Sequence, residues 1–178
     1  PLNSGSFVTS IAHIDAATGD LIERHELPEG QPLSLRHIDL AKSGELVIGA
    51  QVHTSAGPAE PLVFRKRRGS KVEAVELADS VTEALAGYVS SVAISDDGAT
   101  CAVTSSRRGV IVIAELATGR VLRLDRIADV SGIAAGATPH AFVATSGYGD
   151  VRTLALDGET PDRASVLRFN WDNHLARL

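Results

Sequence analysis

The feature that most constrains this chain is a phrase that it uses twice. Residues 11–27 read IAHIDAATGDLIERHEL, and residues 110–127 read VIVIAELATGRVLRLDRI. Each copy is an alternating apolar run, an acidic residue, a turn ending in Thr-Gly, and a second alternating run. This pattern predicts a β-hairpin. The chain therefore repeats a hairpin, with its turns at Thr18-Gly19 and Thr118-Gly119.

Two further hairpin turns fill the intervals between and after these copies. Arg67-Arg68-Gly69 lies midway between the two Thr-Gly turns, and Asp157-Gly158 follows the second. A unit of short strands that recurs about every 40–50 residues is typical of β-propeller blades. We therefore predict an all-β fold made of four-stranded antiparallel blades of the WD-repeat type.

The alternating segments divide residues 1–178, treated as a single propeller segment, into blades. Residues 7–27 give only the outer two strands of a blade, whereas residues 35–77, 88–127 and 130–169 each give four strands. Residues 171–178 are predicted to form one more innermost strand. Because ring closure removes open sheet edges, we expect about half of a seven-bladed ring. One short helix is expected over residues 80–86, where SVTE (80–83) fits a capping box.

Composition excludes several classes of protein. The net charge of −5 argues against broad nucleic-acid binding, and no apolar run approaches the roughly 20 residues of a membrane span. Cys101 is the single cysteine, so an intrachain disulfide and a zinc site built on paired cysteines are excluded. We interpret the basic run 65–68 as a solvated hairpin tip. The chain begins at Pro1 and contains no methionine, so we expect a processed form or a piece of a longer polypeptide.

An ordered series of phrases resembles a known family. The phrases are SLRHIDLAKSGELVIGAQ (34–51), GYVSSVAISDDG (87–98), IDAATGDLIERHELP (14–28) and WDNHLARL (171–178). Together they resemble the bacterial domain-of-unknown-function family 1513. The resemblance implies a YVTN-like or WD-repeat propeller of about twice this length, exported to the periplasm by the twin-arginine pathway. It also implies a link to iron or metal uptake, and a last strand that completes a blade begun upstream of Pro1.

Blade topology predicts which residues gather at the mouth of the central channel. These are residues at the starts of the innermost strands and in the loops between the second and third strands of each blade. The Thr-Gly and Asp-Gly turns fall on the opposite face. The predicted ligand-binding residues at the mouth are Arg36, His37, His53, Tyr88, Arg107, Asn173 and His174.

Two histidines are the candidate metal ligands. His37 and His174 occupy equivalent positions in predicted innermost strands, each preceded by a polar residue. Two imidazoles on the channel wall could bind a transition metal, with Asp172 or Asp129 completing the site. The alternative is that each histidine only hydrogen-bonds between blades and orients a loop.

The arginines at the same mouth suggest a different ligand. Arg36, Arg107 and Arg108 could clamp a small anion, or they could be solvated charges on the rim. Trp171, the single tryptophan, is expected to pack between blades, with an exposed contact role as the alternative.

The sequence contains no nucleophile elbow, phosphate-binding loop, zinc-protease motif or dinucleotide fingerprint. We therefore expect a non-enzymatic binding or interaction module, with no catalytic residues and a transition metal as the only candidate cofactor. The alternatives are a metal-dependent, lactonase-like propeller hydrolase that uses His37 and His174, or a structural platform that docks a protein. The expected partners are the remaining half of the propeller, another copy of the chain, or a periplasmic protein.

Overall fold

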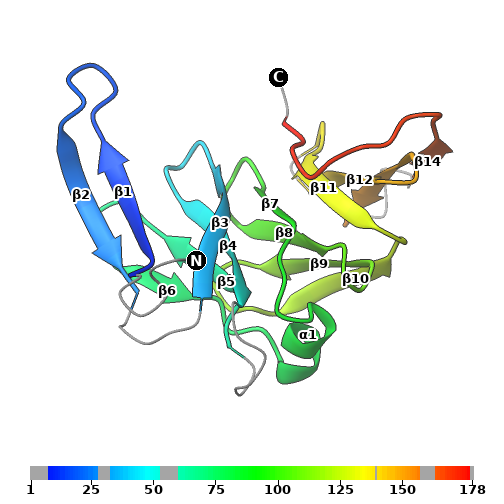
Figure 1. Cartoon of the computed structure of the whole chain (residues 1–178), viewed down its shortest axis with the longest axis horizontal. Coiled ribbons are helices and arrows are strands. Elements are labelled where there is room, and N and C mark those ends of the chain that lie inside the picture. Colours follow the sequence, from blue (N-terminus) through cyan, green and yellow to red (C-terminus); the bar gives the residue numbers. More distant parts are fainter. Residues whose placement is uncertain (1–7, 28–32, 53–59, 139, 157–162, 177–178) are drawn as a thin grey trace, which may run out of the picture.

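The computed structural model describes residues 8–27, 33–52, 60–138, 140–156 and 163–176. Within these ranges the chain forms fourteen strands and one helix. The strands make three four-stranded antiparallel sheets and one two-stranded sheet, which follow one another side by side in chain order (Figure 1). Consecutive strands are neighbours in every sheet, as in the meander of a propeller blade. The prediction of an all-β fold built from four-stranded blades is confirmed.

We number the sheets as blades 1 to 4 in chain order. Blade 1 contains only β1 (Ser10–Ile14) and β2 (Leu21–Glu26). Blade 2 contains β3 (Leu33–Leu40), β4 (Leu46–Val52), β5 (Val63–Lys66) and β6 (Val72–Ala74). Blade 3 contains β7 (Ser91–Ile94), β8 (Thr100–Ser105), β9 (Val110–Glu115) and β10 (Val121–Arg126). Blade 4 contains β11 (Val130–Ala135), β12 (Ala141–Ser146), β13 (Asp150–Ala155) and β14 (Arg163–Val166).

The two Thr-Gly turns have the same local structure. Gly19 N–H donates to the Asp15 carbonyl at 2.8 Å, and Gly119 N–H donates to the Glu115 carbonyl at 2.9 Å. In each turn the threonine hydroxyl accepts a further backbone N–H. Both glycines have a positive φ, a conformation that other L-residues rarely adopt. The repeated phrase therefore encodes a repeated hairpin.

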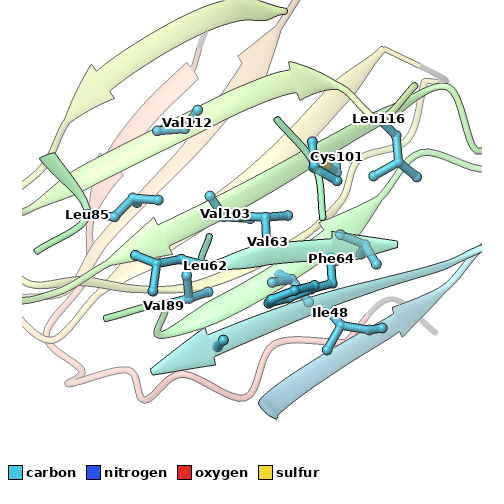
Figure 2. Close-up of a cluster of buried hydrophobic side chains, with 14 of the residues drawn as sticks. Ile48, Leu62, Val63, Phe64, Leu85, Val89, Cys101, Val103, Val112 and Leu116 are labelled. Atoms are coloured by element: carbon cyan, nitrogen blue, oxygen red, sulfur yellow. The ribbon is translucent and has the colours of Figure 1, made fainter. Parts of the chain in front are cut away.

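Apolar side chains between the blades form two clusters. The larger cluster extends over blades 1 to 3: it includes Ile48 and Phe64 of blade 2 and Val103 and Val112 of blade 3 (Figure 2), and Ile11 of blade 1 packs against it. The second joins blades 3 and 4 through residues that include Ile111, Ile133 and Phe142. Gly49 permits close packing of blades 2 and 3, since a Cβ there would lie 2.5 Å from Val89 Cγ1. The core therefore lies between the sheets, as expected when each sheet is buried by its neighbours.

The C-terminal segment does not form the predicted innermost strand. Residues 171–176, the described part of the predicted strand 171–178, have no regular secondary structure. The segment instead approaches β11 closely, because a Cβ at Gly132 would lie 3.1 Å from the Asp172 carbonyl oxygen and 3.4 Å from Leu175 Cβ. None of the described strands pairs with this segment. The prediction is therefore wrong for 171–176, although the segment still lies beside an innermost strand.

The short helix is present but begins differently from the prediction. α1 covers Asp79–Ala84, and its N-cap is Ala78, which provides no side-chain hydrogen bond. Ser80 lies inside the helix, so the predicted capping box is wrong. The buried side chain of Val81 anchors the helix to the larger apolar cluster instead.

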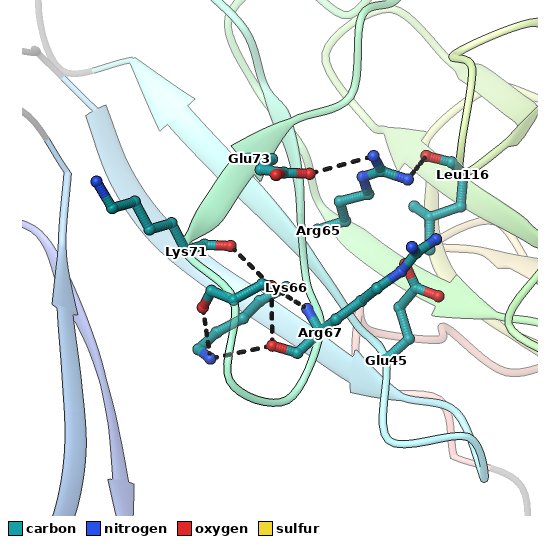
Figure 3. A network of polar contacts seen from close by, with 8 residues as sticks. Glu45, Arg65, Lys66, Arg67, Lys71, Glu73 and Leu116 are labelled. Atoms are coloured by element: carbon teal, nitrogen blue, oxygen red, sulfur yellow. Dashed lines mark hydrogen bonds and ion pairs between the residues drawn. The ribbon is translucent and has the colours of Figure 1, made fainter.

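The basic run at 65–68 is not entirely a solvated hairpin tip. Lys66 is only 1% exposed, and its Nζ donates to the carbonyls of Arg67 and Ser70 at 3.2 and 3.1 Å (Figure 3). The same Nζ pairs with Glu23 Oε2 of blade 1 at 3.0 Å. The prediction is wrong for Lys66 because strand alternation points this side chain toward blade 1. Its charge is paired there with Glu23 and is also bound by two carbonyls of its own hairpin turn.

Candidate functional site

The innermost strands of blades 2 to 4 and the C-terminal segment enclose a groove of about 830 Å³. Strand β3 contributes a run from Arg36 to Leu40, and β7 and β11 contribute shorter runs. The C-terminal segment contributes residues 173–176. The groove thus lies where the central channel of a propeller is expected, the usual place for a ligand on this fold.

His37 faces the groove from the middle of β3. A β-bulge between Leu35 and His37 makes Arg36 the extra residue of this strand and shifts the register against β4. The side-chain nitrogen of Asn173 lies 3.4 Å from His37 Nε2 and donates to the Ser90 carbonyl at 3.0 Å. Asn173 therefore connects the C-terminal segment to both β3 and the start of blade 3.

His174 lies beside His37. The two ring centroids are 6.2 Å apart, with the ring planes at 52°. His174 Nδ1 lies 3.3 Å from Asp172 Oδ2, so its Nε2 remains available to a ligand. Hydrogen bonds from the His174 backbone N–H and from its ring hold the pKa of Asp172 below its ordinary value. Asp172 is thus an ionised carboxylate that orients the imidazole of His174.

The groove has an excess of hydrogen-bond donors. Asp39 accepts backbone N–H groups from Leu40 and Ile94, both at 2.9 Å. Asp96 forms an ion pair with Lys42, whose Nζ lies 2.8 Å from Asp96 Oδ2. Among the described residues, Arg36 makes no hydrogen bond or ion pair. The carboxylates of the groove are therefore engaged, whereas the guanidinium of Arg36 is left for a ligand.

The pKa of His37 is lowered from its ordinary value. Burial is the main cause, followed by the positive charges of His174 and Arg36. Each of these disfavours the imidazolium. His37 is therefore neutral near pH 7, with one ring nitrogen that donates and one that accepts.

The predicted mouth residues separate into two groups. Arg36, His37, Asn173 and His174 line the groove together. Tyr88 and Arg107 lie outside its lining and form a pair of their own, with the Arg107 guanidinium carbon 4.3 Å from the centre of the Tyr88 ring. This geometry fits a cation–π contact at the rim. His53 lies outside the described residues.

Several residues of the groove were missing from the sequence prediction. Asp39 links β3 to β7 through its bond to the Ile94 amide, and Lys42 links the same blades through Asp96. The alternation of strand side chains could have identified Asp39, because it is two residues from His37 and shares its face. No comparable signal marks the Lys42–Asp96 pair, which joins two turns 54 residues apart.

Trp171 precedes the C-terminal residues that line the groove. Trp171 is half-buried, and its ring contacts Phe169 edge-on with centroids 5.9 Å apart. Its Nε1 is buried and has no hydrogen-bond acceptor among the described residues.

The described ranges contain no group of three or more His, Cys, Asp or Glu placed to hold a metal. No described helix is long and apolar enough to cross a membrane.

Comparison with solved structures shows the fold. A chain of the nidogen/laminin complex aligns with 92% of this chain and 60% of its own length, at TM-score 0.59 and 15% identity. The WD40 repeats of RRP9 align with 80% of this chain and 41% of their own, at TM-score 0.59 and 17% identity. KlAtg21, in complex with the coiled coil of AgAtg16, aligns with 81% of this chain and 46% of its own length, at TM-score 0.54 and 13% identity. The chain thus spans 41–60% of these propellers.

Comparison with sequences shows the family. No curated protein matches the chain. The model of the family described as "Protein of unknown function (DUF1513)" matches residues 1–178, the whole chain. This match confirms the resemblance carried by the ordered phrases along the sequence. The chain belongs to the DUF1513 family, and its residues fold as WD40-like propeller blades.

Proposed function

We propose that this chain is a non-enzymatic binding module whose ligand, a small oxyanion, occupies the groove between β3, β7, β11 and the C-terminal segment. The observation that carries the proposal is the convergence of Arg36, His37, Asn173 and His174 on one groove. The Arg36 guanidinium, which has no partner among the described residues, and three side chains with N–H groups together suit a carboxylate, phosphate or sulfate group. Charge-assisted hydrogen bonds of this kind are the stronger ones in proteins.

The carboxylates of the groove support binding rather than catalysis. Asp39 and Asp172 already accept backbone or ring hydrogen bonds, and Asp96 pairs with Lys42. A general base needs a free lone pair directed at the substrate. These three carboxylates are instead used to hold the blades and the C-terminal segment in place.

A transition metal is the second candidate ligand, and the Asp172–His174 pair favours it. A carboxylate on one imidazole nitrogen is the usual outer partner of a metal-bound histidine. Two imidazoles on one tetrahedral ion would have ring centroids about 5 Å apart, given metal–nitrogen bonds of about 2.0 Å. His37 and His174 would need to approach by only about 1 Å. The neighbouring Arg36 and the absence of a third described ligand make the anion the stronger candidate.

Titration calorimetry with inorganic phosphate, sulfate, citrate and zinc tests the proposal. We expect one of the anions to bind, and Arg36→Gln to weaken its binding at least about 10-fold, since a charged hydrogen bond contributes about 1.5–3 kcal/mol. Arg108→Gln is the matched control, because Arg108 is an exposed arginine outside the groove. Zinc binding that requires His37 and His174 would select the metal, and with it the hydrolase alternative. Anion binding unaffected by Arg36→Gln would overturn the proposed site.

The proposed partner and location rest on the extent of the fold and on the family. We propose that the ring is completed either by the remaining half of the propeller or by another copy, because the chain spans 41–60% of the solved propellers it matches. The family resemblance supports a periplasmic location and a link to iron or metal uptake. Cell fractionation and growth under iron limitation test these two points.

A further inference from the structure

The aromatic residues outside the core gather at one end of blades 3 and 4, where the second strand of each blade turns into the third. The described members are Tyr88, Tyr148, Phe169 and Trp171. Tyr148 and Phe169 are 69% and 64% exposed, whereas Phe64 and Phe142 are buried in the two apolar clusters. Aromatic side chains are enriched at the centres of protein–protein interfaces. This end of the molecule therefore has the composition of a docking surface.

Backbone hydrogen bonds join the turns at this end into one surface. In the blade 4 turn, Gly147 N–H donates to the carbonyl of Asp129, which connects blades 3 and 4, at 3.1 Å. Leu167 N–H, after the last strand of blade 4, donates to the Gly149 carbonyl of the same turn at 2.8 Å. Tyr148 therefore lies between the connection from blade 3 and the segment that carries Phe169. We call the surface the aromatic rim and define it by five residues, Tyr88, Arg107, Arg126, Tyr148 and Phe169.

The two arginines of the aromatic rim carry charge that no described carboxylate neutralises. Arg107 donates to the Ala86 carbonyl at 3.5 Å, and Arg126 donates to the Arg108 carbonyl at 3.3 Å. Each guanidinium has five N–H donors, so most of them remain for a partner. Other described arginines do form ion pairs with carboxylates of their own blade; these are Arg24, Arg65, Arg67, Arg120 and Arg123. In a chain of net charge −5, the aromatic rim is thus a local positive surface.

The backbone beneath the aromatic rim is held in place before any partner binds. The buried Ser90 hydroxyl accepts the Ser106 N–H at 2.9 Å and donates to the Ser106 hydroxyl at 3.0 Å, which fixes the turn that carries Arg107. Among the described residues, both non-glycines with a positive φ, Ala86 and Asp129, also lie at this end, each at 53°. Strained backbone of this kind clusters at functional sites. A surface ordered in advance loses less entropy when it binds.

We propose that the aromatic rim docks an acidic segment of a partner protein that also carries apolar side chains. Its carboxylates pair with Arg107 and Arg126, and its apolar side chains pack on Tyr148 and Phe169. The five residues are spread over the turns of two blades rather than around a cavity, which suits an extended polypeptide better than a single small anion. None of them lines the groove, so the inference is independent of the proposed function. Neighbouring blades pack on sheet faces, so completion of the ring leaves this end of the strands open.

Fluorescence anisotropy with labelled peptides tests the proposal. The probes are short synthetic peptides in which glutamate alternates with leucine or phenylalanine, and the matched control peptides carry glutamine in place of glutamate. We expect the glutamate peptides to bind the chain, and to bind more weakly as salt rises. The glutamine peptides should bind at least about 10-fold more weakly, because they lose the charged hydrogen bonds. Equal binding of the two sets, or no binding of either, would overturn the proposal.

Variants of the aromatic rim locate the binding surface. Arg107→Gln, Arg126→Gln and Tyr148→Ser should each weaken binding of the glutamate peptides at least about 10-fold. The melting temperature should stay close to that of the unmodified chain, since all three side chains are exposed. Arg68→Gln is the matched control, because Arg68 is an exposed arginine in the turn between the third and fourth strands of blade 2, at the opposite end of the strands. Equal peptide binding by the rim variants and the control would contradict the assignment.

Two other partners would give different results. Sedimentation that shows self-association of the chain, lost in Arg107→Gln, would overturn the proposal in favour of a second copy. Binding to phosphatidylglycerol vesicles without binding to the glutamate peptides would overturn it in favour of a membrane surface. The peptide measurements are made without phosphate, sulfate or citrate, so their outcome does not depend on whether an anion binds in the groove.

Discussion

Ile38 and Ile133 occupy equivalent positions on two innermost strands, yet Ile38 is 61% exposed and Ile133 is 1% exposed. Their sequence contexts, HIDL (37–40) and GIAA (132–135), both place the isoleucine within an innermost strand. The difference lies in the neighbouring blade. Ile133 packs with side chains of the complete blade 3, whereas Ile38 faces the two strands of blade 1. Burial of a propeller strand is therefore decided by the strands opposite to it, because each sheet is covered by its neighbour.

Truncation of these two isoleucines should give the largest contrast. Ile133→Ala should lower the free energy of unfolding of residues 1–178 by about 2–5 kcal/mol, because it leaves a cavity in a closed core. Ile38→Ala should change it by no more than about 0.5 kcal/mol, as at other surface positions. Urea unfolding of both variants measures the difference. Equal losses would mean that blade 1 covers β3 in solution.

The Thr-Gly turns offer a smaller contrast of the same kind. A Cβ at Gly119 in blade 3 would lie 2.0 Å from the Glu76 carbonyl oxygen of the chain segment after blade 2, whereas a Cβ at Gly19 in blade 1 would contact nothing within 4 Å. Both alanine variants also carry the cost of a positive φ, about 1–2 kcal/mol. Gly19→Ala should lose about that much stability, and Gly119→Ala about 1–2 kcal/mol more, because backbone must also move. Thermal unfolding of the two variants compares them, and equal losses would show that the turn of blade 3 does not pack on its neighbour.

The contact between blade 1 and the outer part of blade 2 should be sensitive to acid, with the smallest effect of the three. The hydrogen bond from Lys66, followed by that from His25, holds the pKa of Glu23 below its ordinary value of 4.5. A carboxyl with a lowered pKa in the folded state stabilises the fold above the pKa it has when unfolded, and loses that contribution as pH falls through its folded pKa. Stability should therefore decline as pH falls below about 4.5.

Glu23→Gln should flatten that part of the stability profile, since the amide does not titrate. Glu73→Gln is a suitable control, because Glu73 pairs with Arg65 and its side chain is 56% exposed. Chemical unfolding at a series of pH values compares the two variants. An unchanged acid profile in Glu23→Gln would mean that the Lys66–Glu23 pair does not hold blade 1.

The sequence predicted the strands well and the ends of the chain poorly, for physical reasons. Alternating runs with Gly-containing turns are local signals, so the hairpins at Thr18-Gly19 and Thr118-Gly119 could be predicted from a few residues each. The state of residues 171–176 depends on whether a partner strand is present, which no local pattern reports. Burial of Lys66 likewise depends on Glu23, which lies 43 positions away in another blade.

The candidate site was predicted in part. Equivalent positions on innermost strands indicated His37 and His174, and the structure brings these two rings within 6.2 Å. Blade topology also placed Tyr88, at the start of an innermost strand, and Arg107, in a loop between second and third strands, at the same mouth, but both lie outside the lining of the groove. How deep a residue lies in the channel depends on the tertiary arrangement of the blades, which the order of strands along the chain does not determine.

Thiol labelling at position 38 tests the central claim, an inner face left open beside blade 1, most directly. In dilute residues 1–178, Ile38→Cys should react with a soluble disulfide reagent at the rate of a free thiol, and Ile133→Cys at least about 100-fold more slowly. The native Cys101 should stay silent, because burial raises the pKa of its thiol to about 12. Where the remaining half of the proposed ring is present, labelling at position 38 should slow to the rate at position 133. Slow labelling of Ile38→Cys in dilute residues 1–178 would contradict the account.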